Sequence, residues 1–322
     1  MIKEKKIYGC YNCFAKLVPL KKSKSPFYPV ICSKCKTINR KIINNCLFCG
    51  SKNSEPWGKP VRNFFSVKCK NCNIVYIKNP LSKKVQSLFY ENYLKNVHQK
   101  KQIKKKQRSI MYKIELNYLI SCIKNFKKIK NVLDVGCGGG YFLDLLKKIK
   151  KKTFGVETGR DSFLEAKKKH KMFYGEFNEK LNIKHKFDLI VMRGVIEHVS
   201  YPKKYAYYGQ KLLKKNGYLF ITATPNLDSI AARIFKERWT LHRPESHILH
   251  LSEGHVDKLF PRKKFTKVGS KSLYLDTPYE NFEQDIKRIS KEITSQNKGN
   301  NSHQESPPFF GSMMTVVYKK DV

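Results

Sequence analysis

The stretch from residue 132 to residue 140 reads Val-Leu-Asp-Val-Gly-Cys-Gly-Gly-Gly, and it decides the fold of this chain. An apolar run typical of a buried strand leads into a glycine turn, and an amphipathic helix pattern begins at Tyr141. Glycine lets the backbone bend sharply and lets a ligand come close, and the first N–H groups of the following helix supply hydrogen-bond donors. The pattern predicts a strand, turn and helix unit that binds a nucleotide cofactor.

Two carboxylates accompany this turn. Asp134 lies two residues before the first glycine, and Glu157 ends the next predicted strand, about 20 residues beyond the turn, where an acid binds ribose hydroxyls. Tyr141 stands where a dinucleotide fingerprint requires its third glycine, which disfavours a pyrophosphate ligand. A purely structural glycine turn in another α/β fold is the remaining alternative.

Strand and helix patterns alternate from residue 131 onward, which predicts an α/β fold with a doubly wound, seven-stranded sheet. We expect strands at 131–135, 153–157, 172–175, 187–192 and 217–222, with two more near 265–275 and 312–319. Residues 82–126 have a helical pattern that could cap the core. Residues 294–308 are polar with almost nothing to bury, so we expect a mobile loop there.

The form Asp-x-Gly-x-Gly-x-Gly of residues 134–140 resembles motif I of the class I S-adenosylmethionine-dependent methyltransferases. Segments 187–199, 217–226 and 239–247 follow in the order seen in the ubiquinone-type and cell-surface-saccharide-associated subfamily. The resemblance runs from about residue 80 to the end of the chain. It implies S-adenosylmethionine as cofactor and in-line methyl transfer to a small or carbohydrate-like acceptor.

The resemblance also implies which residues contact the cofactor. The expected cofactor-binding residues are Asp134, Gly136, Cys137, Gly138, Gly140, Glu157, Glu176 and Arg193. Glu176 and Asn178 both stand near the position that contacts adenine, and the sequence does not choose between them. Tyr90 and Tyr93 are candidates for lining the pocket, with ordinary helix packing as the alternative.

Three residues are candidates for catalysis. The carboxyl ends of the strands form the site in a doubly wound sheet, which directs the segment after residue 192 toward it. His198 has a pKa range suited to proton abstraction, and Glu197 could orient a ring or a substrate hydroxyl. His247 is the rival base, in a segment that folds over the acceptor in the resembling family. His242, His247 and His250 match no dedicated metal-site spacing.

The first 75 residues contain four Cys-x-x-Cys pairs. The candidate ligands are Cys10, Cys13, Cys32, Cys35, Cys46, Cys49, Cys69 and Cys72. Two such pairs about 15 to 20 residues apart complete a tetrahedral zinc site. The spacing favours two consecutive zinc ribbons holding two structural ions, and a cross-braced pairing is the alternative.

A disulfide framework would need an oxidising compartment. The N-terminus has charges but no apolar run, and no stretch is long and apolar enough to span a membrane, so we expect a cytoplasmic protein with reduced cysteines.

The domain prediction is a tandem zinc-ribbon module at 1–78, a helical cap at 79–130 and a methyltransferase domain at 131–322.

The net charge of +41 raises the question of a nucleic-acid partner. Only ten of the 66 basic residues are arginine, the residue suited to bidentate phosphate recognition, which favours a solvated lysine-rich surface. An RNA methyltransferase that holds a polynucleotide with its ribbons is the second hypothesis, and a non-enzymatic zinc-ribbon interaction protein is the third. The sequence does not reveal the oligomeric state.

Overall fold

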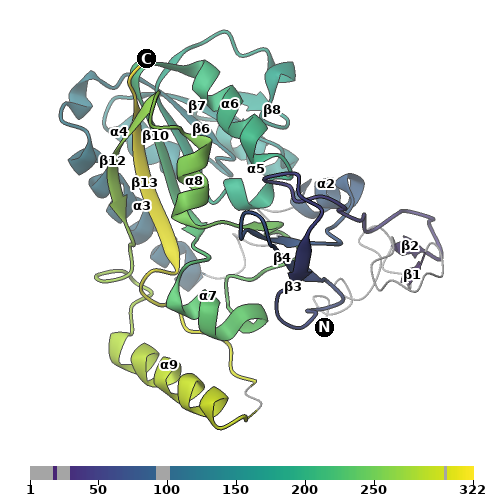
Figure 1. Cartoon of the computed structure of the whole chain (residues 1–322). Coiled ribbons are helices and arrows are strands. Elements are labelled where there is room, and N and C mark those ends of the chain that lie inside the picture. The colour runs from purple at the N-terminus through teal and green to yellow at the C-terminus, as the bar shows by residue number, and fades with distance from the viewer. Residues whose placement is uncertain (1–16, 20–29, 92–101, 301–302) are drawn as a thin grey trace.

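The chain was analysed as a computed structural model that describes residues 17–19, 30–91, 102–300 and 303–322. A seven-stranded sheet with the strand order β12-β13-β10-β9-β6-β7-β8 forms its centre (Figure 1). Its strands are β6 (Asn131–Val135), β7 (Lys152–Glu157), β8 (Lys171–Tyr174), β9 (Phe187–Arg193), β10 (Leu213–Pro225), β12 (Phe265–Lys271) and β13 (Met313–Lys320). Strands β6 to β10 are parallel, and β13 is antiparallel to both β10 and β12. The doubly wound, seven-stranded α/β prediction is confirmed.

Side chains alternate across this sheet and bury both faces. On one face Val132 and Val191 pack with helices α3 and α4, and on the other Leu133 and Met192 pack with α6 and α8. The helices are α2 (Lys83–Glu91), α3 (Gln102–Cys122), α4 (Tyr141–Lys148), α5 (Arg160–Lys167), α6 (Pro202–Leu212), α7 (Ile230–Phe235), α8 (Glu253–Leu259) and α9 (Phe282–Asn297). Short 3-10 turns are η2 (Phe126–Lys128), η3 (Glu179–Leu181), η4 (Ile196–His198) and η5 (Lys236–Arg238). Along the part of the chain that the structure describes, no helix combines the length and apolar character needed to cross a bilayer.

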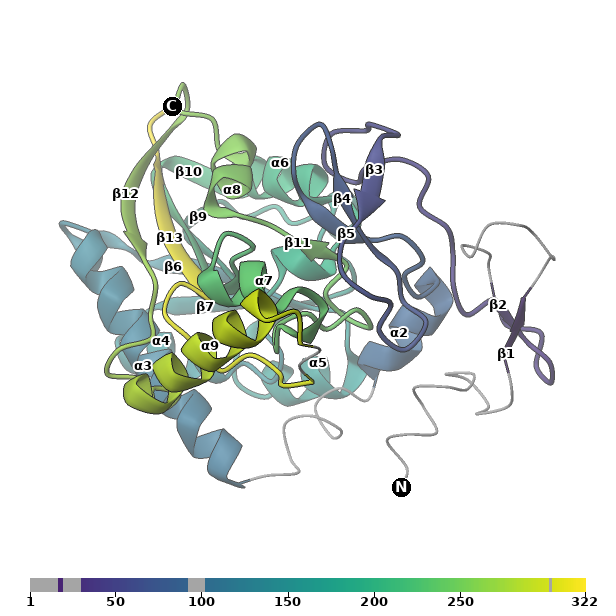
Figure 2. The same cartoon turned by 60° about the horizontal axis from the view of Figure 1, so that its bottom comes forward.

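The N-terminal region forms two small sheets. Strands β1 (Leu17–Pro19) and β2 (Val30–Cys32) pair with each other, while β3 (Ser54–Pro56), β4 (Ser66–Cys69) and β5 (Val75–Ile77) form a second sheet. Strand β11 (Leu249–His250), which follows β10 in the α/β part of the chain, completes that second sheet beside β5 (Figure 2). Phe48 and Ile74 share a hydrophobic core with β6 and β9. The second half of the N-terminal module is therefore joined to the α/β domain by strand pairing. The predicted domain boundary at residue 78 did not include this pairing.

Residues 294–308 differ from the predicted loop. Helix α9 continues to Asn297, so the first four of these residues are helical. Ser306 is buried, and its hydroxyl accepts a hydrogen bond from the Thr240 amide at 3.0 Å. Helix α9 lies against α7 through Ile289, and Glu292 pairs with Arg238. The prediction was wrong for residues 294–297 because these tertiary contacts extend a helix that composition alone disfavours.

Candidate active site

The glycine turn follows β6 directly and has a left-handed backbone at alternate residues. Gly136 has φ of +68°, and a Cβ there would lie 2.9 Å from Cγ2 of Val195, so no side chain fits. Gly138 has φ of +56°, and among the described residues a Cβ there would meet no atom within 4 Å. The turn is thus packed against the protein at one glycine and open toward the cavity at the other.

Glu157 holds the turn from the neighbouring strand. Its Oε2 accepts a hydrogen bond from the Gly138 amide at 2.7 Å, and its Oε1 accepts bonds from the Thr158 and Gly159 amides, each at 2.7 Å. Burial raises the pKa of Glu157, and the three amides oppose that shift by stabilising the carboxylate. The side chain is one of the walls of the cavity, where a ribose would be within its reach.

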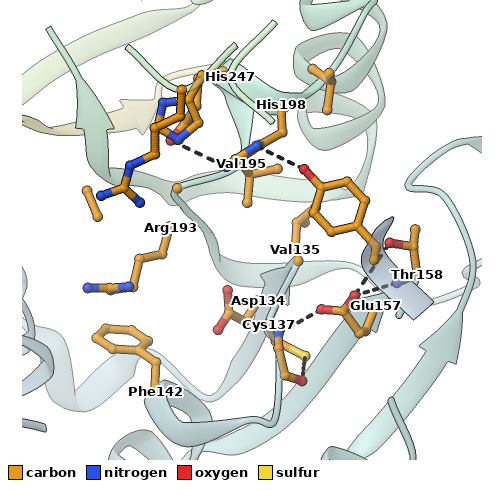
Figure 3. A pocket seen from close by; sticks show the side chains of 18 of the residues that line it. Asp134, Val135, Cys137, Phe142, Glu157, Thr158, Arg193, Val195, His198 and His247 are labelled. Carbon is orange, nitrogen blue, oxygen red and sulfur yellow. Dashed lines mark hydrogen bonds and ion pairs between the residues drawn. The ribbon is translucent and has the colours of Figure 1, made fainter. Parts of the chain in front are cut away.

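A cavity of about 1350 Å³ opens at the carboxyl ends of β6, β7 and β9. Roughly 300 to 1,000 Å³ is typical for one small ligand, so the cavity has room for two reactants. Its walls include ten of the predicted site residues, namely Asp134, Gly136, Cys137, Gly138, Glu157, Glu176, Arg193, Glu197, His198 and His247. Gly140 does not line it and instead lies beside His170, at the start of α4. Figure 3 shows His198 and His247 on one side of the cavity and Asp134, Cys137 and Glu157 on the other.

The residues on the Asp134 side fit a polar nucleoside cofactor. Asp134 is 2% exposed, and its Oδ1 has no hydrogen-bond partner among the described residues. Burial raises the pKa of Asp134 to about 8. An unsatisfied buried carboxyl beside an open glycine cradle is what a ligand with hydrogen-bond donors would complete.

The structure separates the two candidates for the adenine side. Glu176 lines the cavity and pairs with Lys83 of α2 at 3.0 Å. Asn178 instead caps η3, where its side chain accepts a hydrogen bond from the Lys180 amide. Tyr90 also lines the cavity, whereas Tyr93 lies outside the described residues.

Arg193 is bound to a partner that the sequence did not reveal. Its Nε donates to Oε2 of Glu115 at 2.6 Å and its Nη2 donates to Oε1 at 3.1 Å, a bidentate pair between β9 and α3. The guanidinium lies 4.4 Å from the centre of the Tyr112 ring. Glu115 is buried, and a carboxylate on the apolar face of a predicted helix is the one signal that could have identified it.

His198 has a tautomer that its neighbours define. Its Nδ1 lies 2.8 Å from the Ser246 carbonyl oxygen, which can only accept, so Nδ1 carries the proton. The Tyr90 hydroxyl lies 3.0 Å from the same nitrogen. Nε2 is therefore unprotonated, and it lies 3.8 Å from Oε1 of Glu197. Burial lowers the pKa of His198 to about 4, which keeps the ring neutral near pH 7.

The other two candidates for catalysis lie beside His198. The rings of His198 and His247 are 4.8 Å apart between centroids, and the Nδ1 of His247 donates to the Leu241 carbonyl at 2.7 Å. Burial raises the pKa of Glu197 to about 8, so its carboxyl is largely protonated at neutral pH. The structure thus brings His198, Glu197 and His247 together, as the sequence suggested, although their roles remain predictions.

The cavity wall also contains residues that the sequence did not single out. They include Thr240, Leu241, Leu273, Tyr274, Phe309 and Met313, which come from four separate segments. This wall is mainly apolar and aromatic, with Arg243 as a cation. Its members are dispersed along the chain, which is why no local motif marks them.

Four cysteines of the N-terminal region form one cluster. The sulfur atoms of Cys46, Cys49, Cys69 and Cys72 all lie within 4.8 Å of one another. The Sγ of Cys46 is 3.7 Å from that of Cys72, and the Sγ of Cys49 is 3.5 Å from that of Cys69. Zinc bonds thiolates at about 2.3 Å, which places tetrahedral ligands about 3.8 Å apart, so the cluster fits a structural zinc ion. This grouping agrees with consecutive rather than cross-braced ribbons.

The remaining cysteine pair has the local geometry of a knuckle. The Cys35 amide lies 3.3 Å from the sulfur of Cys32. Cys10 and Cys13, its predicted partners, lie outside the described residues, so the second zinc site stays a prediction.

Comparison with known proteins places the α/β part of the chain. A family model described as methyltransferase domain matches residues 105–268. The ubiquinone biosynthesis O-methyltransferase of Pelagibacter ubique is 34% identical over 103 residues, which are 30% of this chain and 43% of that protein. The mitochondrial ubiquinone biosynthesis O-methyltransferase of Candida albicans is 33% identical over 112 residues, 31% of this chain and 34% of that protein. The chain thus spans less than half the length of these two relatives. A solved structure of the plantazolicin methyltransferase BamL, in complex with a triazolic desmethylPZN analog and SAH, has 12% identity and a TM-score of 0.49, covering 74% of this chain and 97% of that one.

Proposed function

Because the chain belongs to the family described as methyltransferase domain, we propose that it transfers a methyl group from S-adenosylmethionine to a hydroxyl oxygen of a small organic acceptor. One observation carries this proposal: a single cavity, which Gly138 also lines, has Cys137 and Glu157 on one side and His198 and His247 on the other. The relatives named as O-methyltransferases of ubiquinone biosynthesis support oxygen as the methylated atom and a quinone precursor as the acceptor.

The turn and Glu157 would form the donor half of the site. S-adenosylmethionine, when bound, supplies an electrophilic methyl group on a sulfonium sulfur. Glu157 is placed to accept hydrogen bonds from ribose hydroxyls, while the unsatisfied oxygen of Asp134 offers a further acceptor. Glu176 would take the adenine side of the cavity. Holding both reactants in line supplies most of the rate in such a reaction.

His198 is our candidate for the general base. With Nδ1 donating to the Ser246 carbonyl, the lone pair of Nε2 would be free to accept the proton of an acceptor hydroxyl. The neutral carboxyl of Glu197 adds no negative charge that would repel the developing oxyanion. His247 is more deeply buried, with 7% exposure, and we assign it the support of the His198 ring.

The cysteine cluster suggests where the protein works. Four reduced thiols that fit zinc are typical of a reducing compartment, which supports the cytoplasm. We assign the zinc ion a structural role because all four ligand positions are cysteine, with no open position for a substrate.

A labelled-methyl screen tests the proposed function. Wild-type protein is incubated with methyl-labelled S-adenosylmethionine and, separately, quinone precursors, sugar nucleotides and total RNA. We expect label on a quinone precursor, a loss of about 10²- to 10⁴-fold in the His198→Asn variant, and no loss in the matched His303→Asn variant at an exposed position. Label on RNA alone, or equal transfer by both variants, would contradict the proposal.

A further inference from the structure

Cys69 of the cysteine cluster lies in a sheet whose strand β11 begins two residues after His247, which lines the cavity. Strand β11 pairs with β5, with Leu249 opposite Tyr76, and the Ile77 amide donates to the Ile248 carbonyl at 3.0 Å. Strand β5 begins three residues after Cys72. Figure 2 shows β3, β4 and β5 beside β11, at the side of the α/β domain.

Side chains of the same zinc-ribbon region hold the segment that leads into β11. The hydroxyl of Ser66 lies 2.7 Å from Nε2 of His242, and both residues are buried. Arg62 donates to Glu245 at 2.6 Å. The segment from residue 239 to residue 250, which we call the histidine segment, is therefore held at its backbone and at two side chains by the ribbon.

A cysteine of the cluster also contacts helix α8, which follows the histidine segment. The carbonyl oxygen of Cys72 accepts a hydrogen bond from Nε2 of His255 at 2.7 Å. The Nδ1 of that ring lies 2.6 Å from the Ser252 hydroxyl and accepts a bond from the Ser252 amide, which closes the capping box of α8. The turn around Cys72 thus also determines where α8 begins, directly after β11.

The histidine segment reaches the reacting groups at its other side. Its Ser246 carbonyl fixes the tautomer of His198, and its His247 ring lies against the His198 ring. A shift of Ser246 would remove the acceptor of the Nδ1 proton of His198. The tautomer with an unprotonated Nε2 would then no longer be favoured by this hydrogen bond. The carboxylate of Glu157 is held differently, because it accepts hydrogen bonds from the amides of Gly138 in the glycine turn and of Thr158 and Gly159 directly after β7.

We propose that zinc binding by Cys46, Cys49, Cys69 and Cys72 positions the histidine segment, and with it His198, while the cofactor half of the site forms independently. This inference rests on the proposed function, and it makes the four cysteines positioning residues for the acceptor half. A segment of this size buries too little apolar surface to fold without its metal. Loss of zinc would therefore remove β5 as the partner of β11 and free the histidine segment.

The chain contains its own reporter for this interface. Its two tryptophans are Trp57 in the ribbon and Trp239 at the start of the histidine segment. The Trp57 ring lies 6.1 Å from the His250 ring, and the Trp239 ring lies 5.8 Å from it, measured between ring centroids. One tryptophan therefore belongs to the ribbon and the other to the histidine segment. Tryptophan emission therefore reports the packing of the ribbon against the histidine segment.

The experiment compares three full-length variants with the wild type. Cys49→Ser removes one of the two partly exposed cysteines of the cluster. Ser66→Ala removes the contact with His242 and leaves the cysteines intact. Ser51→Ala, which removes another serine hydroxyl of the ribbon, is the matched control. Each protein is assayed for zinc content, amide hydrogen exchange of residues 242–250, tryptophan emission and affinity for S-adenosylhomocysteine.

In Cys49→Ser we expect loss of about one zinc ion per chain, faster exchange over 242–250 by about tenfold or more, and red-shifted emission. Affinity for S-adenosylhomocysteine should stay within about threefold of the wild type. Ser66→Ala should keep its zinc and still exchange faster than Ser51→Ala.

Unchanged exchange in zinc-depleted Cys49→Ser would overturn the inference. So would a loss of S-adenosylhomocysteine affinity as complete as the loss of protection, because the ribbon would then support the whole fold. If Ser66→Ala and Ser51→Ala exchange alike, the coupling fails as well. Failure of the proposed function looks different, since the wild type itself would then not bind S-adenosylhomocysteine.

Discussion

Gly138 combines a left-handed backbone with empty space beside its Cα, and this makes it the residue at which fold and cofactor binding separate most clearly. Gly299, just after α9, has a similar φ of +69° and, among the described residues, also no neighbour within 4 Å of a built Cβ, but it is not one of the residues that line the cavity. A side chain at either position costs about 1 kcal/mol of conformational strain.

We therefore predict that Gly138→Ala and Gly299→Ala lower the free energy of unfolding by similar amounts, about 1 kcal/mol each. Only Gly138→Ala should weaken S-adenosylhomocysteine binding, by about tenfold or more. The added methyl group would occupy the space in which the ligand approaches the protein backbone. Thermal unfolding and calorimetric titration of both variants measure this. Equal affinities in the two variants would show that the turn does not hold the ligand.

Glu197 gives a prediction about pH. Burial raises its pKa to about 8, against about 4.3 in an unfolded chain, so the folded protein holds an extra proton between these values. The free energy of unfolding contributed by this group falls as pH rises through that window. The Glu197→Gln variant cannot lose the proton, so its stability relative to the wild type should rise between pH 5 and pH 8.5 by on the order of 4 kcal/mol.

Chemical denaturation at several pH values measures that difference. Glu179→Gln is the control, because Glu179 is exposed and pairs with Lys211 at the surface. A difference between Glu197→Gln and wild type that shrinks with rising pH would contradict the buried, protonated state of Glu197.

At the scale of elements, the contact of α3 with β9 depends on one buried ion pair. Glu115 on α3 is 1% exposed and forms the bidentate pair with Arg193 at the end of β9. Removing one member of such a pair leaves an uncompensated charge, whereas replacing both members with apolar residues is often neutral.

Glu115→Gln should therefore lower the free energy of unfolding by about 3 kcal/mol, and a second change, Arg193→Met, should restore much of it. The exposed pair of Lys168 and Glu165 offers the comparison, and Glu165→Gln should cost less than about 1 kcal/mol. Denaturant titration of these variants gives the values. Additive losses in the double variant would exclude the coupling.

Sequence patterns predicted the elements of the α/β sheet well and their contacts poorly. The apolar runs at 131–135, 153–157 and 187–192 match β6, β7 and β9 to within one residue at each end, because a buried parallel strand is marked by a continuous apolar run. The Glu115 partner of Arg193 lies 78 residues away, and the pairing of β11 with β5 joins residues over 170 apart. Such contacts depend on the three-dimensional arrangement, and no local period encodes them. The same limit explains why helix α9 was ended too early.

At the scale of the whole molecule, the net charge of +41 must coexist with a site that binds a small acceptor. Neutralising several phosphates makes polynucleotide binding fall by about 10³-fold or more between 50 and 200 mM salt, whereas a small acceptor enclosed in the cavity is affected little. We predict that methyl transfer to a quinone precursor changes by less than about threefold over that range. Initial rates at graded salt test this, with transfer to total RNA as the comparison. A steep fall for the small acceptor would mean that a polyanion surface takes part in its binding.

The central claim is that the turn after β6 and the carboxylate of Glu157 together hold S-adenosylmethionine. Calorimetric titration of wild type and Glu157→Ala with that ligand tests it most directly. We predict one site per wild-type chain and an affinity at least about tenfold lower in Glu157→Ala, because a charged hydrogen-bond acceptor is lost from the ribose side and from the Gly138 amide. An absence of binding to the wild type, or equal affinity in the two proteins, would contradict the claim.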